Sequence, residues 1–185
     1  MMKIGLLGGS FNPAHQGHIH ISNLAAQKLG LNQVWWIPTS QNPLKEKTVT
    51  PFAVRFAGCL EIVKNHPKIR VKNFEKDSFS TYKLIKKLQA QYPKTQFCFI
   101  MGADNLEKFH LWKNFLPLIK LVEFAIFSRA DFLLKAKETR ALQIYQKLVS
   151  LRESKGANNH QLPKFSFFRT KNYDISSSEI RNKSI

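Results

Sequence analysis

The residue types best suited to chemistry gather near the N-terminus, in the segment Gly8-Gly9-Ser10-Phe11-Asn12-Pro13-Ala14-His15-Gln16-Gly17-His18. An apolar run over residues 4–7 leads into this segment, and an amphipathic helical pattern follows it. Glycines after a strand let the backbone approach a phosphate, and the N-terminus of the next helix offers unpaired N–H groups and a positive dipole end. Imidazoles can donate further hydrogen bonds to phosphate oxygens. The spacing therefore predicts a site for nucleotide phosphates.

A metal site is one alternative for these histidines, and simple capping of a helix is another. His15, His18 and His20 follow one another at i, i+3 and i+5, which does not place three rings on one side of a helix. No cysteine or carboxylate lies nearby in the sequence to complete a ligand shell. We therefore favour histidines directed at phosphate, and we predict no metal held by protein side chains.

A second candidate anion site lies near the C-terminus, in Ile175-Ser176-Ser177-Ser178-Glu179-Ile180-Arg181. Three serines before an apolar position are typical of a helix N-terminus, where hydroxyl and backbone N–H groups can surround an anion. The guanidinium of Arg181 could bridge phosphates. An ordinary capped helix is the alternative, and this segment alone does not exclude it.

Both segments resemble signatures of the nucleotidyltransferase superfamily. His15-Gln16-Gly17-His18 is similar to its H-x-G-H signature, and the longer segment is similar to GG-[ST]-F-D-P-x-H-x-G-H, with Asn12 where aspartate is usual. The C-terminal segment resembles I-S-S-T-x-I-R, with Ser178 at the threonine position. The resemblance implies that the two segments hold the ATP phosphates from opposite sides. The residues on the first side would be Gly8, Gly9, Ser10, Phe11, His15 and His18. Those on the second side would be Ser177, Ser178 and Arg181.

The middle of the chain resembles one family within that superfamily, the nicotinate-nucleotide adenylyltransferases. Gly102-Ala103-Asp104 followed by Trp112 is similar to the family's G-x-D…W segment. The resemblance implies that Gly102 and Asp104 lie in the nucleotide crevice and that Trp112 stacks on the pyridine ring of a mononucleotide. An indole face suits a flat, electron-poor ring. A core aromatic is the alternative for Trp112.

Three further positions match the family loosely and would bind the mononucleotide. Lys45 closes Asn42-Pro43-Leu44-Lys45, where the family has P-P-H-[KR]. Ser80 lies near the place of the family's S-Y-T, and Arg129 lies where the family has an Arg-Pro-Gly turn. Each match departs from the pattern at a neighbouring residue.

The resemblance implies transfer of the adenylyl group of ATP to nicotinate mononucleotide, which gives deamido-NAD and pyrophosphate in NAD biosynthesis. Negative charge develops on the phosphates during such a transfer, so positioning and charge stabilisation carry the catalysis. We expect Mg²⁺ to arrive on ATP. Another adenylyl- or cytidylyltransferase of the superfamily, such as pantetheine-phosphate adenylyltransferase, is one alternative. A basic nucleic-acid-binding module and a sensor without catalysis are two others.

Composition limits the classes of protein that fit. A chain of 185 residues with 43% hydrophobic residues suits one globular domain over residues 1–185. No apolar run approaches the roughly 18 residues of a membrane span, and no secretory leader is visible. Cys59 and Cys98 lack C-x-x-C spacing, so we expect free buried thiols and a cytoplasmic protein. The net charge of +17 would suit nucleic acid, but its lysines are spread along the chain, so we do not expect a nucleic-acid partner. The sequence makes no prediction about the oligomeric state.

The elements that must position these residues alternate between strand and helix. We expect an α/β fold with a Rossmann-like, doubly wound parallel sheet and helices on both faces. On helix 52–65 we expect an inward face of Phe56, Cys59, Leu60 and Val63, and we expect the helical segment 105–119 to break near Trp112 and Pro117. The predicted strands are 4–7, 33–38, 69–71, 96–101, 122–127 and 165–168, and the other predicted helices are 17–29, 80–91, 133–154 and 176–183.

Overall fold

Continuous apolar runs form the strands of a single parallel sheet. The computed structural model describes residues 1–39, 50–74, 80–128, 138–153 and 164–170. Six strands in these ranges lie in the order β3-β2-β1-β4-β5-β6, and every neighbouring pair is parallel. The predicted doubly wound sheet is confirmed. The strands are β1 (Met2–Gly9), β2 (Gln33–Pro38), β3 (Ile69–Val71), β4 (Thr95–Gly102), β5 (Glu123–Ser128) and β6 (Phe165–Arg169).

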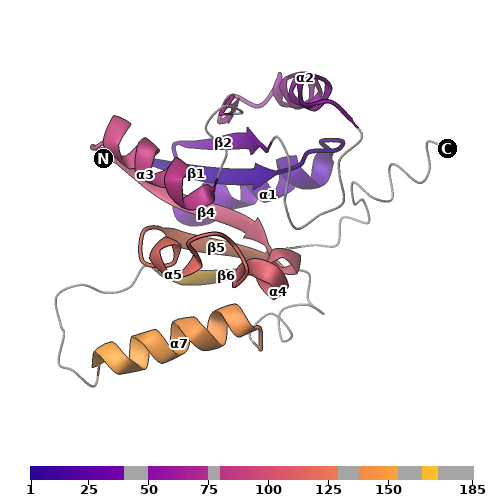
Figure 1. Cartoon of the computed structure of the whole chain (residues 1–185). Coiled ribbons are helices and arrows are strands. Elements are labelled where there is room, and N and C mark those ends of the chain that lie inside the picture. The colour runs from indigo at the N-terminus through magenta and orange to yellow at the C-terminus, as the bar shows by residue number, and fades with distance from the viewer. Residues whose placement is uncertain (40–49, 75–79, 129–137, 154–163, 171–185) are drawn as a thin grey trace.

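Helices cover both faces of the sheet (Figure 1). Helices α1 and α2 contribute buried residues to the core on one face, and α3, α4, α5 and α7 contribute to the core on the other. This division buries β1, β2, β4 and β5 on both sides, which explains why these strands are apolar without alternation. The helices are α1 (Gln16–Leu29), α2 (Phe52–Val63), α3 (Thr81–Gln91), α4 (Leu106–Phe109), α5 (Phe115–Leu118) and α7 (Arg140–Glu153), with a 3-10 turn, η2 (Ala103–Asn105), before α4.

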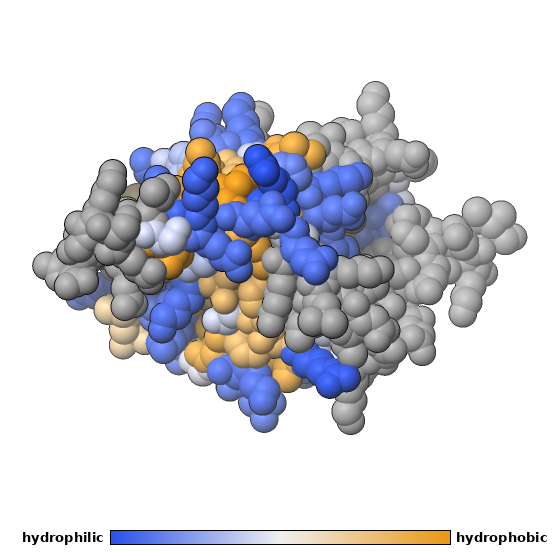
Figure 2. All heavy atoms as spheres, turned by 90° about the horizontal axis from the view of Figure 1, so that it is seen from below, coloured by the Kyte–Doolittle hydropathy of each residue, from blue (hydrophilic) through white to orange (hydrophobic). Residues whose placement is uncertain are grey.

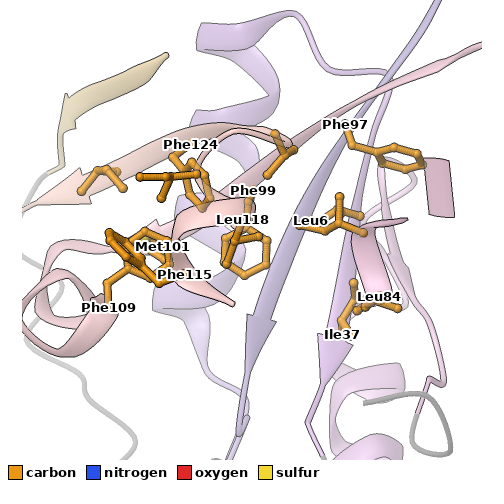
Figure 3. Close-up of a cluster of buried hydrophobic side chains, with 14 of the residues drawn as sticks. Leu6, Ile37, Leu84, Phe97, Phe99, Met101, Phe109, Phe115, Leu118 and Phe124 are labelled. Carbon is orange, nitrogen blue, oxygen red and sulfur yellow. The ribbon is translucent and has the colours of Figure 1, made fainter. Parts of the chain in front are cut away.

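The core beneath α3, α4 and α5 is rich in aromatic rings (Figure 3). The ring of Phe109 lies 5.2 Å from that of Phe124 and 5.1 Å from that of Phe115, between centroids. Burying each phenylalanine contributes about 1.5–3 kcal/mol of transfer free energy. Two helices of one turn each are too short to be stable alone, so this packing fixes α4 and α5 on the sheet.

Helix α2 presents a different inward face from the one the sequence predicts. Cys59 and Val63 are buried, as predicted, but Leu60 is 49% exposed. Arg55, one turn before Cys59, belongs to the buried stripe instead and is only 4% exposed. Arg55 is not part of the inward face that the sequence predicts, and the carbonyl groups that it contacts make its burial favourable.

Two predicted boundaries are also wrong. Pro117 lies inside α5 rather than breaking it, because it is the third residue of the helix, where the backbone N–H has no partner within the helix anyway. The break near Trp112 is confirmed, between α4 and α5. Helix α7 begins at Arg140, since residues 138 and 139 form a turn and a bend; residues 133–137 of the predicted helix lie outside the described residues. The predicted helix 176–183 lies there as well.

Figure 2 shows the side of the molecule on which α7 lies, where hydrophilic and apolar residues both reach the surface. Within the described ranges, none of the helices combines the length and the apolar character needed to cross a membrane.

Candidate active site

The candidate site lies where the strand order reverses, at the carboxyl ends of β1 and β4. These two strands are neighbours in the middle of the sheet, and their connections run in opposite directions from it. Gly8 and Gly9 end β1, and Gly102 ends β4. Crevices at such a reversal are the usual ligand site of doubly wound sheets. The fold therefore brings the two glycine-containing segments of the sequence to one edge.

His15 and His18 form a capping pair at the N-terminus of α1. The backbone N–H of Gly17 donates to Nδ1 of His15 at 3.1 Å, and the backbone N–H of His15 donates to Nδ1 of His18 at 3.2 Å. The two ring centroids lie 3.9 Å apart. No acidic residue occupies the first turn of α1, so the positive end of its dipole is not neutralised within that turn.

These hydrogen bonds fix which nitrogen of each ring can serve a ligand. A ring nitrogen that accepts from a backbone N–H carries no proton, so in the neutral form the proton of each imidazole is on Nε2. Burial, and next the neighbouring His15, lower the pKa of His18 from 6.5 to about 3. His18 is therefore neutral at neutral pH and can donate from Nε2 without being a cation.

The glycine loop is supported from the core by packed aromatic rings. Phe11 is 1% exposed and adopts a positive φ of 46°, a backbone conformation that costs a residue with a side chain on the order of 1 kcal/mol or more. Its ring stacks on Trp36 at 4.9 Å and lies 4.8 Å from the ring of His18. Because the Phe11 side chain is buried, any contact of Phe11 with ATP would come from its backbone.

A buried relay of hydrogen bonds extends this support to α1. The indole N–H of Trp36 donates to Oγ of Ser22 at 2.7 Å, and the hydroxyl of Ser22 donates to the carbonyl of His18 at 2.8 Å. Ser22 is fully buried, so its hydroxyl has lost water and these two bonds replace it. The core thus sets the distance between β2 and the first turn of α1.

The protein's own packing does not require the two glycines at the end of β1. A Cβ at Gly8 would lie 3.4 Å from the ring of Phe99, and one at Gly9 would lie 3.4 Å from the ring of Phe11, both ordinary contact distances. Close approach of a phosphate, which the sequence predicts here, would be a reason for glycine.

Gly102 and Asp104 lie close together at the end of β4. A Cβ at position 102 would collide with Oδ1 of Asp104, but this carboxylate ends a flexible, exposed side chain, and a small rotation would relieve the contact. The same Oδ1 accepts a hydrogen bond from the side-chain amide of Asn105 at 3.2 Å. Packing alone therefore does not require glycine at position 102.

Trp112 lies on the rim of the aromatic core. It is partly exposed, and its ring meets Phe109 edge-on at 5.0 Å and Phe99 at 6.0 Å. A ring that is fixed at its edge and partly exposed satisfies both interpretations given above, so its stacking on a mononucleotide stays a prediction. Ser80 caps α3, with its hydroxyl accepting from the backbone N–H of Lys83 at 3.3 Å; its contact with substrate is likewise a prediction.

Five of the predicted site residues lie outside the described residues. They are Lys45, Arg129, Ser177, Ser178 and Arg181. Arg129 directly follows Ser128, the buried last residue of β5. The roles of all five remain predictions from the sequence.

Sequence reasoning missed Arg55. Its Nη1 donates to the carbonyl of Ser10 in the glycine loop and, at 2.9 Å, to that of Thr39 after β2. Its Nε donates to the carbonyl of Thr50, before α2, at 3.2 Å. The available signal was its position three residues after Phe52 and four before Cys59, inside the apolar stripe of α2.

The described residues contain no group of three histidine, cysteine, aspartate or glutamate side chains close enough to hold a metal ion. Cys59 and Cys98 are free and buried, as predicted. Burial raises the pKa of each thiol to about 12, so both are protonated at neutral pH. Neither thiol is a candidate nucleophile.

A doubly wound sheet with a glycine loop at its point of reversal is typical of nucleotide-binding domains. A family model described as cytidylyltransferase-like matches residues 6–183. Among curated proteins, the probable nicotinate-nucleotide adenylyltransferase of Ruegeria sp. (strain TM1040) is 35% identical and covers 98% of this chain and 97% of its own. That of Methylorubrum extorquens (strain PA1) is 40% identical over 78% of this chain and 79% of its own.

The chain therefore belongs to the nicotinate-nucleotide adenylyltransferase family, within the cytidylyltransferase-like nucleotidyltransferases. A solved structure has the same fold: Plasmodium falciparum nicotinic acid mononucleotide adenylyltransferase complexed with NaAD. It superposes with a TM-score of 0.74 at 23% identity and covers 98% of this chain and 83% of its own. The predicted family and class of enzyme are confirmed.

Proposed function

We propose that this protein transfers the adenylyl group of ATP to nicotinate mononucleotide. A phosphate oxygen of the mononucleotide attacks the α-phosphorus and forms a new P–O bond. The bond from that phosphorus to the bridging oxygen breaks, and pyrophosphate leaves with the electron pair. The products are deamido-NAD and pyrophosphate. Membership of the adenylyltransferase family supports both the reaction and the acceptor.

The single observation that carries the mechanism is the capping pair of His15 and His18. Both Nδ1 atoms accept from the backbone, which leaves Nε2–H of His18 as a neutral donor at the N-terminus of α1. A donor held by the helix cap needs little reorganisation when charge develops on the reacting phosphates. The dipole of α1 adds to this stabilisation.

The remaining residues would hold the two substrates around this donor. Gly8 and Gly9 let the backbone approach the phosphates, and Asp104 lies at the end of the neighbouring strand. Trp112 would stack on the pyridine ring. Magnesium would accompany ATP as part of the substrate and shield its triphosphate. From the sequence, we assign Ser10, Ser177, Ser178 and Arg181 to ATP, and Lys45, Ser80 and Arg129 to the mononucleotide.

The test is the release of pyrophosphate from Mg-ATP with one acceptor at a time: nicotinate mononucleotide, nicotinamide mononucleotide or phosphopantetheine. We expect release with nicotinate mononucleotide. Release with phosphopantetheine alone would keep the histidine mechanism and overturn the acceptor. No release with any of the three would contradict the proposed reaction.

A further inference from the structure

Arg55 is a buried cation that donates hydrogen bonds to carbonyl groups of three segments. The residue is 4% exposed and lies in the first turn of α2. Desolvating a guanidinium is costly unless its N–H groups find acceptors. It donates to the carbonyls of Ser10, Thr39 and Thr50, which are far apart in the sequence. A fork of several fixed N–H groups on one plane is specific to arginine.

Two of these carbonyls lie at the carboxyl ends of β1 and β2, and the third lies just before α2. Ser10 is the first residue after β1, inside the glycine loop. Thr39 is the first residue after β2, and Thr50 precedes α2, so the two flank residues 40–49 and with them Lys45. Thr39 is also tied to the loop directly, since its backbone N–H donates to the carbonyl of Gly9 at 2.9 Å.

We propose that Arg55 is a positioning residue that locks the glycine loop to both ends of the 40–49 segment. This inference rests on the proposed function, because it joins the segment assigned to ATP with the one assigned to the mononucleotide. Arg55 acts through the backbone: it fixes Ser10 and Thr39 relative to each other and leaves the contact with substrate to other groups. By binding these carbonyls, it also keeps partial negative charges from turning toward an anionic ligand.

Two substrates must meet with their reacting atoms aligned, and a shift of about 1 Å can cost about 100-fold in rate. Loss of the lock should therefore raise KM for both ATP and nicotinate mononucleotide and lower kcat. A purely structural role differs in its signature, because it reduces the fraction of active enzyme and leaves both KM values unchanged.

The experiment compares Arg55→Met and Arg55→Lys with the wild type in the pyrophosphate assay, after circular dichroism has shown each variant folded. The matched control is Arg70→Met, since Arg70 is exposed and its Nη1 donates to the carbonyl of its own neighbour Ile69. We expect kcat/KM to fall about 100-fold in Arg55→Met and about tenfold or more in Arg55→Lys, with both KM values raised. Arg70→Met should match the wild type.

Chemical rescue gives a readout that a structural role would not move. Arg55→Ala with guanidinium ion at a few tens of millimolar, far below the molar range that unfolds proteins, should regain at least about a tenth of wild-type kcat/KM. Should Arg55→Met fail to fold, Arg55→Lys decides, because it keeps a cation on a similar stem.

If the wild type is active and both Arg55→Lys and Arg55→Met keep wild-type KM values, the positioning role is wrong and the proposed function stands. A folded, inactive Arg55→Ala that guanidinium does not restore would lead to the same conclusion. A silent wild type with all three acceptors would overturn the proposed function, and this inference with it.

Discussion

The depressed pKa of His18 makes the stability of the protein depend on pH in a predictable direction. In the folded chain this pKa is lowered from 6.5 to about 3, chiefly by burial. As the pH falls below about 6.5, the unfolded chain takes up a proton at this imidazole and the folded chain does not. Stability from this residue is therefore complete above about pH 6.5 and is lost progressively between that value and about pH 3.

The size of the effect follows from the same two values. Around pH 5, protonation stabilises the unfolded chain by about 2 kcal/mol relative to about pH 7.5, and the folded chain gains almost nothing. The perturbation that isolates this effect is His18→Asn, whose Oδ1 can accept the backbone N–H of His15 in place of Nδ1 but does not titrate. Other titrating groups remain in both proteins, so they contribute about equally to both curves.

The assay is urea unfolding of the wild type and His18→Asn at about pH 7.5 and about pH 5, without substrate. We expect the wild type to lose about 2 kcal/mol more free energy of unfolding than the variant between the two pH values. Equal losses in the two proteins would refute the reasoning, because they would mean that His18 titrates in the folded chain much as it does in the unfolded one.

Three further substitutions test the site. His18→Ala should lower kcat about 100-fold or more in the pyrophosphate assay with the fold retained by circular dichroism, and near-normal turnover would remove His18 from the mechanism. Gly8→Ala should raise KM for ATP about tenfold with little change in the free energy of unfolding, since the new Cβ meets only Phe99 at 3.4 Å. The control is Gly58→Ala, whose Cβ lies in open space on α2. This variant should gain about 1 kcal/mol of stability at unchanged KM. Trp112→Ala should raise KM for nicotinate mononucleotide up to about tenfold, and an unchanged value would make Trp112 a core residue only.

Strand positions were the part of the fold that the sequence predicted best. Strands 33–38 and 69–71 were predicted with the bounds that the structure gives. The first is a buried apolar run, as is typical of strands in a parallel sheet, whereas only Ile69 of the second is buried. The predicted helix 17–29 ends where α1 ends, and Gly30 follows it in the left-handed conformation that glycine adopts at little cost. Local chemistry alone decides features of this kind.

Features that depend on partners distant in the sequence were not predictable. On α2, Leu60 is exposed against expectation and Arg55 is buried, because carbonyls of Ser10 and Thr39, remote in the sequence, make burial of the cation favourable. The same holds for Phe11, whose positive φ is stabilised by the ring of Trp36. The glycine loop could be located from the sequence, but the groups that hold its shape could not.

Helix capping and phosphate binding, posed as alternatives for the two histidines, are compatible in the structure. The Nδ1 atoms of His15 and His18 accept the backbone N–H groups, and this use of Nδ1 is what places the proton on Nε2. Capping therefore leaves the Nε2–H group of each imidazole as the donor for a ligand. Alanine removes both functions at once, whereas asparagine keeps an acceptor for the cap and loses the Nε2 donor. A His18→Asn variant with wild-type stability near neutral pH and low turnover would separate the two, and it would assign the catalytic loss to the single N–H group that the cap directs away from the backbone.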